Sequence, residues 1–132
     1  MKINTKKLQN LINKVNKFNK DHGWKPAPAD SAKSIVIEAA ELLEHFQWDE
    51  SDDRKNLGEK VKKKDWEEIG AELADILWYI IAFCEETGID PVKALGKKIK
   101  RNEEKYPTKM FAGKHNPKFY KEQKRKYREK GS

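Results

Sequence analysis

The sequence predicts an all-α domain, a four-helix bundle of the kind that oligomerisation completes. Apolar side chains recur at spacings of three and four residues along four stretches, which is the period of one side of a helix. Prolines and glycines mark the breaks between these stretches, above all at residues 23–28 and 88–91. Only 36% of the 132 residues are hydrophobic while 39% are charged, so one chain has little apolar surface from which to build a core.

The first two helices are expected at residues 4–20 and at about 30–48. The first ends at Asp21-His22-Gly23, and two prolines then exclude a helix until Asp30 or Ser31 offers an N-cap. The expected packing sides are Leu8, Leu11, Ile12, Val15 and Phe18 in the first helix, and Ile35, Ala39, Leu42, Leu43 and Phe46 in the second.

The third and fourth helices are expected at about 63–87 and 91–105, after a polar connection over residues 49–62. Gly88, Asp90 and Pro91 supply a C-cap, an N-cap and a first helical residue in turn, and Tyr106-Pro107 ends the fourth helix. The expected packing sides are Trp66, Ile69, Leu73, Ile76, Leu77, Ile80, Ile81 and Cys84 in the third helix, and Val92, Leu95 and Ile99 in the fourth.

One domain is expected over residues 1–113, with a basic tail or short helix over residues 114–132. No run approaches the ~18 apolar residues of a membrane span, and the N-terminal residues MKINTKKLQN contain no hydrophobic signal core. We therefore expect a cytoplasmic protein. The single cysteine, Cys84, excludes an intramolecular disulfide and is expected to be a small core residue.

Two pairs of acids interrupt the two most apolar helices, at Glu38-x-x-Glu41 and Glu72-x-x-Asp75. Residues three apart lie on one side of a helix, so each pair presents two carboxylates together. No Lys or Arg occurs from residue 69 to residue 84 to pair with them, and burying unpaired carboxylates is costly. A divalent cation removes this cost, and oxygen ligands suit Mg²⁺, with Mn²⁺ as the alternative.

The formal net charge of +7 hides an uneven distribution along the chain. Residues 1–37 carry eight basic and two acidic side chains, residues 38–86 carry six and fifteen, and residues 87–132 carry fifteen and five. A simple nucleic-acid binder has no need of the acidic middle. A site for a metal and a polyphosphate requires acid and base to be brought together by folding.

Three segments, taken in order, resemble the MazG-like all-α nucleoside triphosphate pyrophosphohydrolases, and most closely their dCTP-pyrophosphatase-like branch. They are EAAELLEHFQW from Glu38 to Trp48, Glu72-Leu-Ala-Asp75, and Asn102-x-x-Lys105-Tyr106-Pro107. The resemblance covers roughly residues 4–110. One ExxE spacing is common on exposed helices, but its combination with FQW and KYP is much more specific.

This resemblance implies Mg²⁺-dependent hydrolysis of a nucleoside triphosphate to the monophosphate and pyrophosphate, in a bundle that forms homodimers or homotetramers. It favours a pyrimidine deoxynucleotide such as dCTP as substrate. The implied metal ligands are Glu38, Glu41, Glu72 and Asp75. The implied nucleotide contacts are Tyr79, Asn102, Lys105 and Trp48, with Trp24 as a second stacking aromatic.

Cleavage of a phosphoanhydride requires that the charge on the phosphates be neutralised and that a water molecule be positioned for attack. These two requirements suggest roles for further residues. Glu41 or Glu44 is the candidate for orienting or deprotonating the water, and the residues leave open which of the two acts. Lys98, Arg101 and Lys105 are candidates for holding the outer phosphates, while Trp24 and Trp48 are candidates for stacking on the base.

Each assignment has a structural alternative. The four acids can pair with Lys or Arg of other helices, Trp48 can cover the core, Tyr79 can bond Asp75, and His45 is expected on the surface. The chain as a whole can also be a basic helical protein that binds nucleic acid or senses nucleotides without catalysis. That alternative predicts salt-sensitive binding of DNA or RNA that does not depend on a metal.

Overall fold

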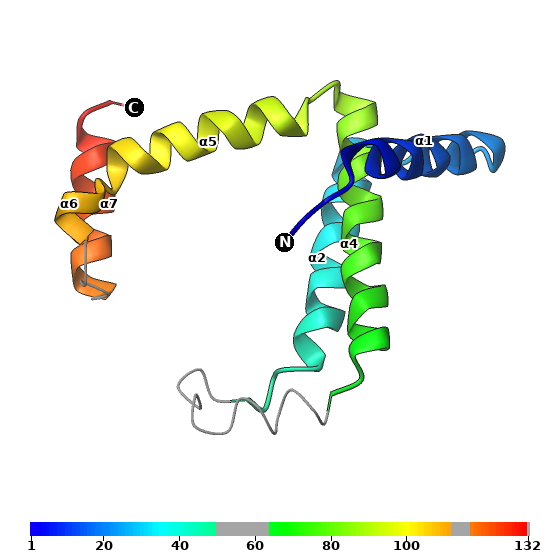
Figure 1. Ribbon diagram of the computed structural model, residues 1–132, viewed down its shortest axis with the longest axis horizontal. Coiled ribbons are helices and arrows are strands. Elements are labelled where there is room, and N and C mark those ends of the chain that lie inside the picture. The colour runs from blue at the N-terminus through cyan, green and yellow to red at the C-terminus, as the bar shows by residue number, and fades with distance from the viewer. Residues whose placement is uncertain (50–63, 112–116, 132) are drawn as a thin grey trace. The chain divides into compact units, whose positions relative to one another are not determined.

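The computed structural model describes residues 1–49, 64–111 and 117–131, and every regular element among them is a helix (Figure 1). The all-α fold class is therefore confirmed. The expected polar connection over residues 49–62 lies, apart from Asp49, outside the described residues. The helices are α1 (Thr5–Asp21), α2 (Pro28–Glu44), α4 (Trp66–Thr87), α5 (Pro91–Lys105), α6 (Thr108–Phe111) and α7 (Pro117–Glu129).

The boundary between α4 and α5 follows the predicted caps. Gly88 is the C-cap of α4 and has a φ of 71°, in the left-handed region that glycine adopts without a steric penalty. The side chain of Asp90 accepts hydrogen bonds from the backbone N–H groups of Val92 and Lys93, and Pro91 occupies the first turn. The chain therefore leaves one helix and starts the next within a few residues.

The expected start of α2 is wrong by about one turn. The helix begins at Pro28 after Ala27, which makes no side-chain capping bond, so neither Asp30 nor Ser31 is the N-cap. Proline suits this place because its fixed φ is helical and its missing N–H would have no partner there. The helix also ends earlier than expected, at Glu44, and residues 45–48 form a turn.

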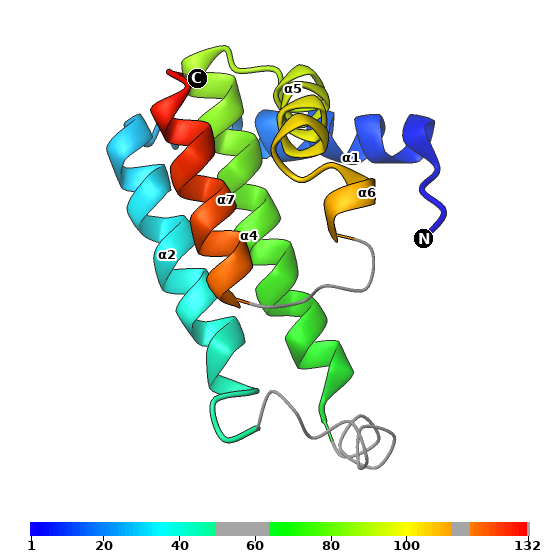
Figure 2. The same ribbon diagram turned by 90° about the vertical axis from the view of Figure 1, so that its left-hand side faces the viewer.

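The chain divides into two compact units, Met1–Ile89 and Asp90–Ser132. In the first unit α2 and α4 lie side by side and run in opposite directions, and α1 packs on α4 (Figures 1 and 2). In the second unit α5 packs on α7, where Gln123 donates a 2.8 Å hydrogen bond to the carbonyl of Lys105. Among the described residues, no helix is long and apolar enough to cross a membrane.

The helices of the first unit turn partly polar sides towards one another. Along α4 one row of buried or half-buried residues runs through Ile69, Glu72, Ile76, Tyr79 and Ala82, at spacings of three, four, three and three, and Trp78, Ile81, Phe83 and Cys84 are half-buried beside it. The corresponding residues are Ser31, Ser34, Ile35, Glu38 and Leu42 in α2, and Ile12, Val15, Asn16 and Asn19 in α1. The acidic pairs therefore lie along the seam between α2 and α4.

Much of the expected packing surface is consequently exposed, which corrects the sequence prediction. The exposed residues that were expected to pack are Leu8, Leu11, Phe18, Ala39, Leu43, Trp66, Leu73, Leu77, Ile80, Val92, Leu95 and Ile99. The buried apolar residues in the described part of the chain are Ile69 and Ala82 alone. The single chain thus leaves apolar helix sides without an internal partner.

Candidate metal and nucleotide site

Three carboxylates meet across the seam between α2 and α4. Glu38 comes from α2, and Glu72 and Asp75 come from consecutive turns of α4. One oxygen of each lies within 4.8 Å of an oxygen of both others. Glu38 and Glu72 are half-buried, whereas Asp75 is exposed and opens the group to solvent.

The carboxylates disturb one another's protonation. Partial burial raises the pKa of Glu38, and a hydrogen bond with Glu41 and the negative charges of Glu41, Asp75 and Glu72 raise it further. Burial also raises the pKa of Glu72, with the charge of Glu41 next in importance, while His45 opposes the shift. A group of like charges held together in this way is unfavourable unless a cation or protons neutralise it.

This donor set fits a divalent cation such as Mg²⁺ or Mn²⁺. Its donors are carboxylate oxygens from two rigid helices, and the exposed side at Asp75 leaves room for water or phosphate oxygens to complete a coordination shell. Burial first, and then the negative charges of the neighbouring acids, raise the pKa values of Glu38 and Glu72, and a bound cation would offset both effects.

The same shifts predict how stability depends on pH in metal-free buffer. Because the pKa of Glu72 is above its ordinary value of 4.5 in the folded protein, the folded state holds more protons than the unfolded state between the two values. The contribution of Glu72 to stability therefore falls as pH rises from below 4.5 through the raised pKa. Thermal melts should show Glu72→Gln gaining a few degrees in Tm over the wild type at pH 7 and little at pH 4. Equal differences in Tm between the variant and the wild type at both pH values would contradict a raised pKa of Glu72 in the folded protein.

His45 lies beside this acidic group, although the sequence predicted a surface position. Its Nε2 is 3.9 Å from Oε1 of Glu72, and its side chain is half-buried, like that of Glu72. The Nζ of Lys64 donates a 2.6 Å hydrogen bond to the carbonyl of His45. It also forms an ion pair with Oδ2 of Asp49 at 2.8 Å. Lys64 therefore ties the turn after α2 to the start of α4. The sequence did not predict this position of His45, because a single histidine without a second ligand at a regular spacing gives no sign of a metal site.

The two candidates for placing a water differ in their surroundings. The carboxyl group of Glu41 hydrogen-bonds with Glu38, and its charge acts on both Glu38 and Glu72. Glu44 is exposed and lies outside the group of three carboxylates. The structure thus places Glu41 closer to the acidic group than Glu44.

Two adjoining cavities lie beside α1 and α4, and the second of them is one helical turn from the acids. They measure about 420 and 470 Å³ and share Asn19, Trp24, Lys25, Pro26 and Ala82. Ser34 and Tyr79 line the second cavity, four residues from Glu38 and Asp75 respectively. Because α2 and α4 run in opposite directions, both spacings place the cavity at the same end of the acidic group, about 6 Å along each helix.

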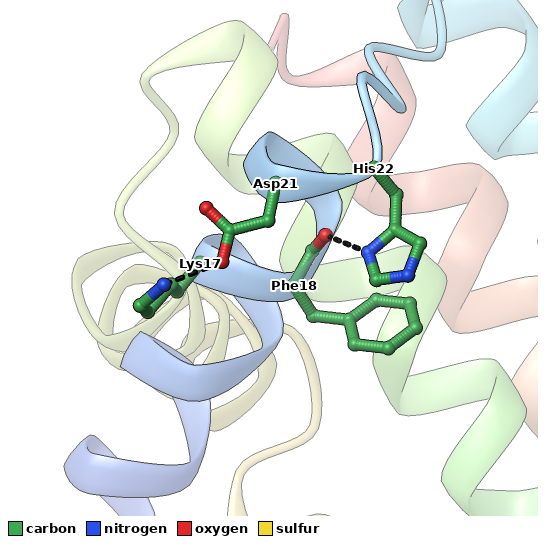
Figure 3. A network of polar contacts seen from close by, with 4 residues as sticks. All are labelled: Lys17, Phe18, Asp21 and His22. Atoms are coloured by element: carbon green, nitrogen blue, oxygen red, sulfur yellow. Dashed lines mark hydrogen bonds and ion pairs between the residues drawn. The ribbon is translucent and has the colours of Figure 1, made fainter.

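Trp24 is held at this cavity by an aromatic cluster at the end of α1. Its ring contacts Phe18 and His22 at centroid distances of 5.5 and 5.4 Å, and Phe18 packs edge-on against Trp78 at 5.3 Å. The His22 ring stacks on Phe18, and its Nδ1 lies 2.7 Å from the Phe18 carbonyl (Figure 3). Beside them, Lys17 pairs with Asp21 in the last turn of α1 (Figure 3). The structure therefore brings together Trp24 and Tyr79 of the predicted nucleotide contacts.

The other predicted contacts have different surroundings. Trp48 is 87% exposed, in the turn after α2. Lys98, Arg101 and Asn102 are exposed on α5, in the second unit. The half-buried Lys105 places its ammonium 5.1 and 5.6 Å from the ring centres of Tyr106 and Tyr127, so it also packs within that unit.

Fold and site together define a helical protein that presents a carboxylate group beside an aromatic cavity, and comparison with known proteins gives its family. Residues 33–122 match the model of the MazG-like family. This match covers more than half of the chain, and the protein belongs to the MazG-like family.

Two relatives agree with this membership. Rat dCTP pyrophosphatase 1 (Rattus norvegicus) is 28% identical over 86 residues, which are 65% of this chain and 49% of the relative. The chain thus spans about half the length of that relative. A crystal structure of a pyrophosphatase from Archaeoglobus fulgidus superposes with a TM-score of 0.67 at 36% identity, covering 76% of this chain and 92% of that one.

Proposed function

We propose that this protein is a Mg²⁺-dependent pyrophosphohydrolase that cleaves a nucleoside or deoxynucleoside triphosphate to the monophosphate and pyrophosphate. The observation that carries the proposal is the group of three carboxylates, within 4.8 Å of one another, on facing helices of a MazG-like chain. The names of its two relatives, a dCTP pyrophosphatase and a pyrophosphatase, support the reaction class. We place the activity in the cytoplasm.

Glu38, Glu72 and Asp75 hold the cation in this proposal, with Glu41 as a fourth ligand or as the group that acts on water. When bound, Mg²⁺ neutralises charge on the phosphate oxygens and so stabilises the leaving pyrophosphate. The carboxylates repel a bare triphosphate, so they bind it only through the cation. Glu41 accepts a proton from the attacking water, because it is beside the acidic group and Glu44 is not.

The basic side chains of α5 are proposed to bind the phosphates that leave. Lys98, Arg101 and Lys105 supply positive charge, and Asn102 supplies hydrogen bonds. Trp24 and Tyr79 flank the base and sugar in the cavity. Trp48 was the other predicted stacking residue, but it follows the opposite end of α2 from Ser34 and does not line this cavity. A pyrimidine deoxynucleotide, dCTP or a modified form of it, is the proposed substrate.

A panel of canonical and modified triphosphates, assayed with Mg²⁺, with Mn²⁺ and with EDTA, tests this function. The expected products are the monophosphate and pyrophosphate in equal amounts, with no activity in EDTA. Release of the diphosphate and orthophosphate would contradict the reaction class. EDTA-resistant binding of DNA or RNA without hydrolysis would favour the nucleic-acid-binding alternative instead.

The protein is also proposed to act as a homodimer or homotetramer. Leu73, Leu77 and Ile80 form an apolar row on the exposed side of α4, and Val36, Ile37 and Leu43 are exposed on α2. Rows of this kind are unfavourable in water and are typical of helices that pack against another subunit. A second copy of the chain is the proposed partner because the same rows are present on every copy.

A further inference from the structure

The most informative polar residue outside the acidic group is Asn19, near the end of α1. It is 9% exposed and lines both cavities, together with Trp24. Its backbone carbonyl accepts a 2.8 Å hydrogen bond from the N–H of Trp24, which fixes the chain as it leaves the helix. A buried asparagine whose side chain borders an open cavity needs partners for both ends of its carboxamide.

One end of that carboxamide is already assigned. The Nε1 of Trp78 lies 3.1 Å from Oδ1 of Asn19. Indole Nε1–H can only donate, so the atom that faces it must be the oxygen of the carboxamide and not its nitrogen. The Nδ2 group of Asn19 is the donor end of the carboxamide, and among the described residues the side chain makes no second hydrogen bond.

Asn19 lines the cavity that adjoins the acidic group. Its cavity is also lined by Ser34 and Tyr79, each one helical turn from a carboxylate of the acidic group. A triphosphate held at the acids through a cation therefore extends its sugar and base towards Trp24 and Asn19. A ring that stacks on Trp24 presents its edge, where its hydrogen-bonding atoms lie, to the surrounding polar groups.

We propose that Asn19, held by Trp78, is a specificity-determining residue that donates a hydrogen bond from Nδ2 to an acceptor on the edge of the nucleobase where cytosine and uracil differ. This inference rests on the proposed function and adds a base-reading residue to it. Cytosine has an acceptor at ring N3 and a donor at its amino group, whereas uracil has a donor at N3 and an acceptor at O4. A fixed donor therefore distinguishes the two bases whichever of these atoms it meets.

Asn19→Asp is the decisive substitution because it keeps the shape and exchanges the donor for an acceptor. One carboxylate oxygen still accepts from Trp78, while the other faces the base. The preference between dCTP and dUTP should invert, with the ratio of their Kd values changing by about ten- to a hundredfold. Trp78→Phe removes the anchor and lets the carboxamide rotate, so this variant should lose the preference without inverting it. Asn13→Asp is the matched control, since Asn13 is exposed on α1 and bonds only Gln9 among the described residues.

The measurement is calorimetric binding of the α,β-imido analogues of dCTP and dUTP with Mg²⁺, alongside hydrolysis of the parent triphosphates. An inverted ratio in Asn19→Asp with an unchanged ratio in Asn13→Asp supports the inference. A uniform loss of affinity for both analogues would make Asn19 structural and overturn it. Wild-type protein that binds and discriminates the analogues without hydrolysing either triphosphate would refute the proposed function but not the inference. Absence of nucleotide binding would overturn both.

Discussion

Glu38→Gln is expected to lower kcat/KM for pyrophosphate release by at least about a hundredfold while the protein remains folded. The substitution keeps the volume of the side chain but removes its negative charge. Glu38 is half-buried and is the carboxylate that α2 contributes to the acidic group. The cation then loses one of its three convergent carboxylates. Burial and then the neighbouring acids raise the pKa of Glu38, and a neutral side chain avoids both costs, so Tm in metal-free buffer should be unchanged or higher.

A matched control separates the acidic group from a general effect of charge. Glu67→Gln makes the same chemical change at an exposed residue in the first turn of α4, outside the group, and should retain activity. The measurements are pyrophosphate release against Mg²⁺ concentration and a thermal melt of each variant. Full activity in Glu38→Gln would refute the metal assignment, and equal losses in both variants would indicate a nonspecific charge effect.

A second pair of variants distinguishes the two candidates for the water. Glu41→Gln should reduce kcat strongly, whereas Glu44→Gln should reduce it less, because Glu44 is exposed and lies outside the group of three carboxylates. The pH dependence of kcat for the two variants is the readout, since loss of a general base removes the corresponding limb of the profile. A larger loss in Glu44→Gln would reverse the assignment.

The helices were predictable because their signals are local. Gly88, Asp90 and Pro91 act through backbone conformation and capping within a few residues, and the structure confirms all three. The start of α2 was not predictable from capping residues alone, since Pro28 opens a helix without a side-chain cap. Propensity indicates that a helix forms but places its ends only approximately.

The orientation of the helices was harder to predict than their extent. An apolar row normally marks the side of a helix that packs within its own chain. Here Leu73 and Leu77 are exposed, and Glu72 and Tyr79 face the seam. The acidic pairs were identified because carboxylates without basic neighbours are unusual in apolar helices. Asn19 was missed because one asparagine in a polar first helix carries no spacing signal, and its importance depends on Trp78, which is distant in sequence.

Leu77→Asp is expected to dissociate the proposed oligomer. Leu77 is 50% exposed at the centre of the row formed with Leu73 and Ile80, so it loses water contact only if another subunit covers it. A twofold interface contains each substitution twice, and burying a leucine contributes about 1.5–3 kcal/mol, so association should weaken by at least about a hundredfold. Light scattering after gel filtration should show the mass of the single 15.5 kDa chain.

Ala71→Asp is the matched control for this experiment because it introduces the same charge into the same helix. Ala71 is exposed, and six residues at about 100° each place it about 120° around the helix from Leu77. It therefore lies off the apolar row, and the variant should keep the mass of the wild type. If Leu77→Asp also keeps that mass, the row on α4 is not the interface. If the wild type is already a single chain at micromolar concentration, the apolar sides of α2 and α4 have another partner, and the proposed self-association is wrong.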